Sequence, residues 1–87
     1  MENSNYIPPK PPKSFRVTLE LNRSESRLDN VLLNALRSQK ENLNLFNISR
    51  NQLKELFNDG KIQIKGQSAR PSSSLAKGTT YIDILGF

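Results

Sequence analysis

The sequence predicts an α+β fold in which a two-helix motif packs on a small, mainly antiparallel β-sheet. Residues 15–21 and 80–85 alternate apolar and polar side chains, as strands with one buried face do. Residues 28–36 instead repeat apolar side chains every three or four positions, which indicates one face of a helix. A second helical pattern after residue 49 gives the order strand, helix, helix, strand, a short optional strand and a final strand.

The N-terminal stretch differs in composition from the rest of the 87-residue chain. Residues 1–14 hold four of the five prolines, and proline-rich segments favour an extended conformation without internal hydrogen bonds. We therefore predict a disordered proline-rich tail at 1–14 and a single domain at 15–87, a length that suffices for one core and not for two.

The first helix is expected to begin at about Arg27, because Ser26 and Asp29 have the spacing of a capping box. Its apolar stripe consists of Leu28, Val31, Leu32, Ala35 and Leu36. The asparagine-rich stretch 41–47 that follows is predicted to be a loop. Leu43 and Phe46 are the expected anchors of this loop on the core.

The second helix has clear signals at both ends. Ser49 and Gln52 form a capping box, and Ile48 with Leu53 provides the hydrophobic staple around it. Gly60 is expected to end the helix in the left-handed conformation.

The remainder of the chain alternates between short strands and turns. KIQIK at 61–65 predicts a strand, a turn follows at 66–67, and residues 68–79 form a polar loop anchored by Leu75. The final strand carries Ile82 and Ile84 on its buried side.

Composition limits the classes of function. Thirteen Lys and Arg against eight Asp and Glu give a net charge of +5, which favours polyanionic partners, nucleic acid first. Because the chain has no Cys and no His, it lacks thiolate metal ligands and the commonest metal ligand and general base. We predict no metal and no cofactor. No apolar run approaches the ~20 residues of a membrane span, and the N-terminus lacks a secretory signal, so a cytoplasmic location is expected.

The cations of the second helix occupy positions at which they slightly destabilise that helix. At about 100° per residue, Arg50 and Lys54 lie on one flank of the buried face, away from Glu55 and Asp59. Like charges at this spacing cost roughly 0.2–0.5 kcal/mol, and a cation in the first turn opposes the helix dipole. The free amides of that turn, with Arg50 beside them, would suit a phosphate. The alternative is that both side chains are merely solvated, with Lys54 lying along the apolar surface.

The pattern of these residues resembles a known RNA-binding family. Arg27-Leu28-Asp29 opens the first helix and Ser49-Arg50 the second, and the later signals are Gly60-Lys61, Gly66, Arg70-Pro71-Ser72 and Lys77-Gly78. Over about residues 27–85 this resembles the S4 domain, the RNA-binding domain of small-subunit ribosomal protein four. With the strand at 15–21 running into residue 27, the chain is most similar to the N-terminal module of pseudouridine synthases that modify large-subunit ribosomal RNA.

The resemblance implies that the two-helix element and the adjoining hairpin lie on structured RNA, which would be ribosomal RNA or tRNA, or the ribosome itself. Lys61 and Lys65 on the outer strand face, and Arg70 and Lys77 in the loops beyond, would extend one continuous basic patch. We expect a monomer. The expected RNA-binding residues are Arg27, Ser49, Arg50, Lys54, Lys61, Lys65, Arg70 and Lys77. Arg27 has an alternative structural role, which is pairing with Asp29.

The sequence departs from the family at three places. Lys65 stands where the family usually has Asn before the glycine of the turn, and Thr79 stands where it commonly has Asp. The segment between the helices, 39–48, is longer than usual. The first two changes make the patch more positive, whereas the third leaves the position of the first helix open.

Two other classes of function remain in view. A protein-interaction module could present the same surface to an acidic partner. A β-grasp carrier typically ends in Gly-Gly, whereas this chain ends in Gly86-Phe87. Catalysis by this chain is not expected, because Cys, His, a Gly-rich phosphate loop and a clustered carboxylate pair are all absent. In the pseudouridine synthases the catalytic aspartate lies in a separate, larger domain. The sequence leaves open whether the native protein carries such a domain.

Overall fold

The fold is α+β, as predicted, and a computed structural model describes residue 7 and residues 9–87. The elements are β1 (Ser14–Leu21), α1 (Leu28–Ser38), α2 (Leu43–Phe46), α3 (Arg50–Asn58), β2 (Ile62–Ile64), β3 (Gln67–Ser68) and β4 (Gly78–Leu85). The four strands form one antiparallel sheet in the order β1-β4-β2-β3. No helix in the described part of the chain combines the length and the apolarity that a membrane crossing requires.

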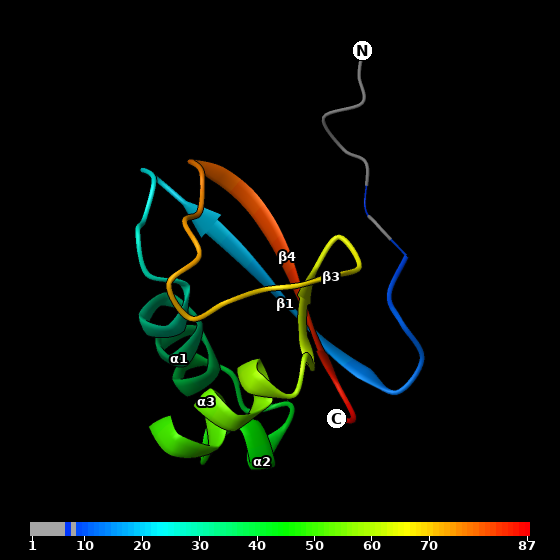
Figure 1. The fold of residues 1–87 in the computed structure, drawn as a ribbon. Coiled ribbons are helices and arrows are strands. Elements are labelled where there is room, and N and C mark those ends of the chain that lie inside the picture. The colour runs from blue at the N-terminus through cyan, green and yellow to red at the C-terminus, as the bar shows by residue number, and fades with distance from the viewer. Residues whose placement is uncertain (1–6, 8) are drawn as a thin grey trace.

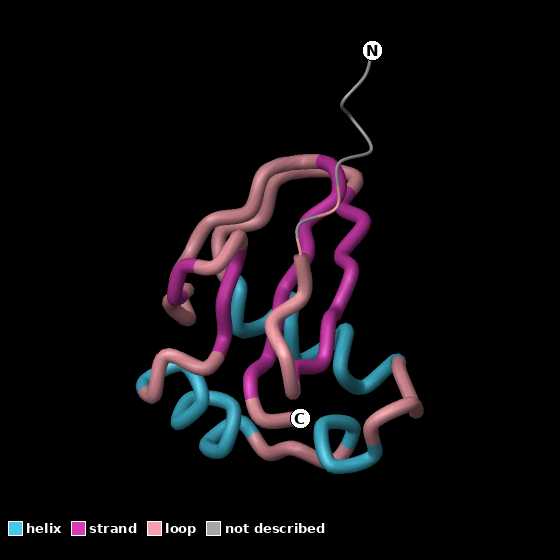
Figure 2. Tube along the Cα trace, turned by 90° about the vertical axis from the view of Figure 1, so that its right-hand side faces the viewer, coloured by secondary structure: helices cyan, strands magenta, loops and turns pink. Residues whose placement is uncertain are grey.

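The core lies where the three helices, which gather on one side of the sheet, meet the apolar strand residues (Figures 1 and 2). Val17 of β1 pairs with Ile82 of β4, and Ile62 of β2 pairs with Ile84. These four side chains point to the helices because side chains alternate across a strand. The fully buried large side chains are Leu28, Leu32, Leu36, Leu45, Ile62, Ile82 and Ile84.

The opposite face of the sheet carries a buried ion pair. Arg16 and Asp83 are register partners, and the Arg16 Nε–Asp83 Oδ1 distance is 2.7 Å. Asp83 is only 3% exposed, and the Arg16 guanidinium also lies 5.3 Å from the centre of the Tyr81 ring. The hydrogen bond from Arg16 to Asp83 raises the pKa of Arg16. A buried carboxylate is stable only with such a partner.

The end of the proline-rich segment lies against the edge strand β1 and against the residue that follows β4. Arg16 Nη2 donates a hydrogen bond to the Pro9 carbonyl oxygen, and the Ser14 hydroxyl donates to that of Pro11. The Gly86 amide donates to the carbonyl oxygen of Lys13. We predicted a disordered tail over residues 1–14, whereas β1 begins at Ser14. Residues 1–6 and 8 of that prediction lie outside the described residues.

The start of α1 differs from the predicted capping box. Arg27 is the N-cap and makes no side-chain cap hydrogen bond, so Ser26 and Asp29 do not form the box. The amides of Leu28 and Asp29 instead donate to the carbonyl oxygens of Ser73 and Pro71. The prediction failed because this helix end is capped by a loop more than forty residues away, which no local spacing records.

The stretch predicted as a loop at 41–47 contains the short helix α2. The Asn42 side chain accepts a hydrogen bond from the Leu45 amide and caps this helix. Leu45 is fully buried, whereas Leu43 is 60% exposed, so Leu43 is not the anchor that we predicted. One helical turn directs position 45 rather than position 43 toward the core.

The predicted start and end of α3 are confirmed, and the turn of the β2–β3 hairpin lies one residue earlier than predicted. The capping box of Ser49 and Gln52 is complete, and Gly60 has φ +72°. The two-residue turn consists of Lys65 and Gly66, one position earlier than predicted, and both have positive φ (54° and 79°). Such turns match the twist of the flanking strands.

The loop of residues 69–77, here the 69–77 loop, is held to the segment before α1. Leu75 is buried, as predicted, and its backbone exchanges two hydrogen bonds with Glu25. Together with the bonds from the start of α1, this pairing fixes Pro71 beside the helices. β4 then begins at Gly78, two residues before the predicted strand.

Candidate functional site

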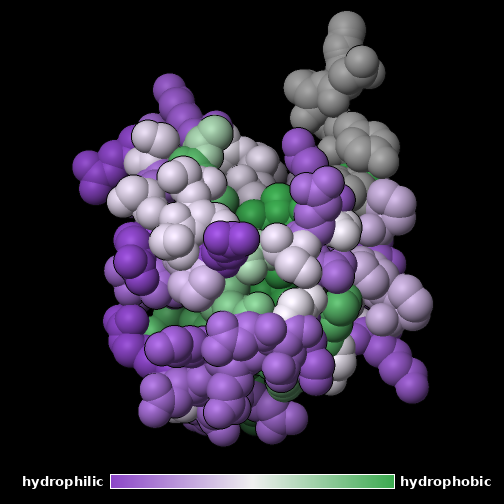
Figure 3. Space-filling model, in the orientation of Figure 1, coloured by the Kyte–Doolittle hydropathy of each residue, from purple (hydrophilic) through white to green (hydrophobic). Residues whose placement is uncertain are grey.

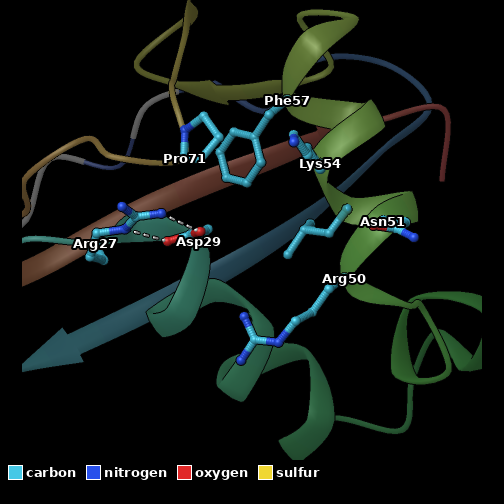
Figure 4. A pocket seen from close by; sticks show the side chains of 8 residues that line it. Arg27, Asp29, Arg50, Asn51, Lys54, Phe57 and Pro71 are labelled. Carbon is cyan, nitrogen blue, oxygen red and sulfur yellow. Dashed lines mark hydrogen bonds and ion pairs between the residues drawn. The ribbon is translucent and has the colours of Figure 1, made fainter.

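A cleft of about 250 Å³ opens between the start of α1, one flank of α3 and the 69–77 loop. Figure 4 shows its walls, with Arg27 and Asp29 on one side, Arg50 and Lys54 on the other, and Phe57 beside Pro71 at one end. The lining residues are Arg27, Asp29, Arg50, Asn51, Leu53, Lys54, Phe57 and Pro71. We refer to this site as the basic cleft, because three cations and one carboxylate give it a net charge of +2.

The two cations from α3 keep their charge available to a ligand. Arg50 extends toward α1, where its Nη1 donates to Asn30 Oδ1 at 3.1 Å, a neutral acceptor. Lys54 is exposed and has no ion pair within the described part of the chain. The flank predicted by the helical wheel is therefore a wall of the cleft, and the carboxylates of α3 lie elsewhere.

Arg27 is largely committed to an internal partner. Its Nε and Nη2 donate to the two carboxylate oxygens of Asp29, at 3.1 and 2.9 Å. This hydrogen bonding lowers the pKa of Asp29 and raises the pKa of Arg27. The structural alternative considered for Arg27 is thus observed, and its contribution to the positive potential of the cleft is smaller than that of Arg50 or Lys54.

The two helix N-termini differ in the amides that they leave free. The α1 amides of Leu28 and Asp29 donate hydrogen bonds to carbonyl oxygens of the 69–77 loop, so these two amides are not free to bind an anion. In α3 the capping box occupies the amides of Ser49 and Gln52. The amides of Arg50 and Asn51 have no acceptor among the described residues, which leaves them available to an anion.

The other predicted site residues do not line the basic cleft. Ser49 is the helix cap, and its hydroxyl already accepts from the Gln52 amide at 3.1 Å. Four further cations are exposed and form no ion pair among the described residues: Lys61, Lys65, Arg70 and Lys77. Arg70 directly precedes Pro71, whereas Lys65 lies in the hairpin turn. The structure therefore gathers Arg27, Arg50 and Lys54 of the predicted set and places the rest outside this cleft.

The apolar part of the cleft was not predicted as part of a site. Leu53, for which the sequence predicted only a place in the hydrophobic staple, and Phe57 are both buried (3% and 5% exposed). A signal was present, because Phe57 falls only about 20° from Arg50 on the helical wheel. Pro71 could not be placed from the sequence. Its position depends on the hydrogen bonds between the 69–77 loop and α1.

The opposite flank of α3 is acidic and lines a different cavity. Glu55 and Asp59 surround it together with Leu56 and Phe87, and its volume is about 330 Å³. Charge is therefore segregated on α3, as the helical wheel predicted. Figure 3 shows the hydropathy of one face, where hydrophilic side chains cover the helices and hydrophobic surface lies between them and the loop above.

Comparison of the chain with protein-family models, curated proteins and solved structures gave no match. Within the described residues, no group of three or more Asp and Glu side chains lies close enough together to hold a metal ion.

Proposed function

We propose that this chain is an RNA-binding module that recognises structured RNA, either ribosomal RNA or tRNA, through the basic cleft. It acts alone or as an accessory domain of an RNA-modifying enzyme such as a pseudouridine synthase. The observation that carries the proposal is the placement of Arg50 and Lys54 on one wall of a concave surface, with two free α3 amides next to them.

The energetics of α3 support an external anion. Arg50 and Lys54 repel each other at this spacing, and Arg50 sits at the positive end of the helix dipole. Neither cation has a carboxylate partner among the described residues. A phosphate at the first turn would relieve both effects, because it adds negative charge where the amides and the guanidinium converge.

RNA is favoured over other polyanions by the shape of the site and by the resemblance to the S4 family. A-form duplexes and folded RNA are read mainly through backbone geometry, which suits a small rigid surface with a few fixed cations. The positions that match the family's basic surface include Arg50 and Lys54. As the sequence predicts, we propose that the module is monomeric and cytoplasmic, and size-exclusion chromatography would test the first point.

The test compares two variants of equal charge. Arg50→Gln/Lys54→Gln removes two cations from the cleft, and the matched control Lys13→Gln/Lys40→Gln removes two exposed cations away from it. Binding of a fluorescent ribosomal RNA fragment is measured by anisotropy, and circular dichroism verifies that both variants are folded. We expect the cleft variant to bind at least tenfold more weakly than the control. Equal affinities would refute the proposal.

The alternative is a protein-interaction module that presents the same cations to an acidic partner. A pull-down from lysate distinguishes the two readings, since ribonuclease treatment abolishes capture through RNA and leaves capture of an acidic protein intact. Loss of capture by Arg50→Gln/Lys54→Gln together with insensitivity to ribonuclease would favour the alternative.

A further inference from the structure

The basic cleft has a feature that phosphate contacts do not require. Phosphates need cations and amides at a surface, whereas this cleft is a hollow with an apolar floor formed by Leu53 and Phe57 and an apolar edge at Pro71. Its volume of about 250 Å³ lies just below the roughly 300–1,000 Å³ of pockets that enclose drug-sized ligands. That size suits one planar ring rather than a long chain.

The apolar side chains and the Arg50 guanidinium lie at different ends of the cleft. In Figure 4 the ring of Phe57 lies beside Pro71 at one end, and Arg50 lies at the other end of the α3 wall, one helical turn before Lys54. A ligand with a flat ring and an attached anionic group would satisfy both ends at once. Asp29, which the Arg27 guanidinium holds in place, adds carboxylate acceptors at the opposite wall.

The unpaired nucleotide of a folded RNA has this chemistry. Bases in loops and bulges leave the stack and pack on aromatic side chains, whereas bases inside a duplex are not accessible in this way. We propose that the basic cleft takes one unpaired base of the RNA over its apolar floor and against the ring of Pro71, while the phosphate of that nucleotide binds Arg50 and Lys54. This inference rests on the proposed function and specifies which part of a structured RNA the site selects.

The rigidity of the edge supports this assignment. Pro71 is fixed because its carbonyl accepts the Asp29 amide at 3.0 Å and because Ser73 accepts the Leu28 amide at 3.1 Å. The Phe57 side chain, on α3, is held in the hydrophobic core of the domain. A preformed surface of this kind loses little conformational entropy when a ring packs against it.

The experiment uses two RNAs with the same number of phosphates, a stem-loop with unpaired bases and a fully paired duplex. We expect the stem-loop to bind the full chain at least tenfold more tightly than the duplex. The NMR signals of the Phe57 ring protons should shift on addition of the stem-loop and stay in place with the duplex, since the ring current of a base in the cleft changes the local magnetic field.

Two variants distinguish an effect on base binding from an effect on the stability of the fold. Pro71→Ala removes a ring at the surface, and Phe57→Leu keeps an apolar side chain in the core. Each should lower stem-loop affinity by a larger factor than it lowers duplex affinity. The matched control Phe15→Leu removes a half-buried ring on β1, outside the cleft, and should change neither affinity.

Two results would overturn the inference, and they differ in what they imply. Equal affinity for the two RNAs, with no effect of Pro71→Ala or Phe57→Leu, would exclude a base in the cleft and leave phosphate binding to structured RNA intact. Failure of the wild-type chain to bind either RNA would remove the proposed function itself, and the base site with it.

Discussion

The salt dependence of RNA binding should identify the cations that contact phosphate. Each neutralised phosphate contributes about −0.9 to the slope of log affinity against log salt for a duplex and about −0.7 for a single strand. Of the cleft cations, Arg50 and Lys54 have no carboxylate partner among the described residues. Arg50→Gln/Lys54→Gln should therefore flatten the slope by about 1.4–1.8. With equal affinities of the two proteins at about 1 M salt, this change corresponds to a roughly 25- to 60-fold loss of affinity at about 0.1 M salt.

The assay is fluorescence anisotropy with one stem-loop RNA over about 50 to 300 mM KCl, a range in which the slope is linear. The comparison variant, Lys61→Gln/Lys65→Gln, removes two cations that the family resemblance implies and that lie outside the cleft. We expect a smaller change of slope for this hairpin variant. An unchanged slope for the cleft variant, or a larger change for the hairpin variant, would refute the assignment of phosphate contacts to Arg50 and Lys54.

Three further predictions concern charge and backbone conformation. Asp29→Asn should release Arg27 and steepen the salt slope by up to about 0.7–0.9, as anisotropy would detect. Because the Arg27 guanidinium lowers the pKa of Asp29, the pair stabilises the fold above the unfolded pKa of the carboxyl group. That stabilisation is lost as pH falls through the folded pKa, so urea denaturation should show a weaker acid dependence in Asp29→Asn, and an identical dependence would contradict this reasoning. Arg16→Leu leaves the buried Asp83 carboxylate without its ion pair and should lower the free energy of unfolding by about 3–5 kcal/mol. The double variant Arg16→Leu/Asp83→Leu should restore most of this loss, because it removes the unpaired charge as well. If Arg16→Leu is as stable as wild type in urea, the ion pair does not have this role. Lys65→Asn should raise the melting temperature by a few degrees, since Asn tolerates the φ of 54° better than Lys, and calorimetry showing no increase would count against that explanation.

The sequence by itself determined the elements whose signals are local. Alternation at 15–21, the capping box of Ser49 and Gln52 and the left-handed Gly60 are all visible within a few residues, and the structure has each of them. The segregation of charge on α3 was also predictable, because the helical period converts spacing directly into position around the axis. These features depend on backbone geometry that neighbouring residues fix together.

Tertiary structure decided the composition of the site. Arg27 pairs with Asp29 while the 69–77 loop caps α1, and this loop brings Pro71 beside Phe57. Each of these contacts, apart from the ion pair, joins residues far apart in the chain. Their distances follow from how the helices and the loop pack on the sheet, which no short-range pattern encodes. The sequence therefore located the cations of α3, and only the packing of the whole domain turned their flank into the wall of a cleft.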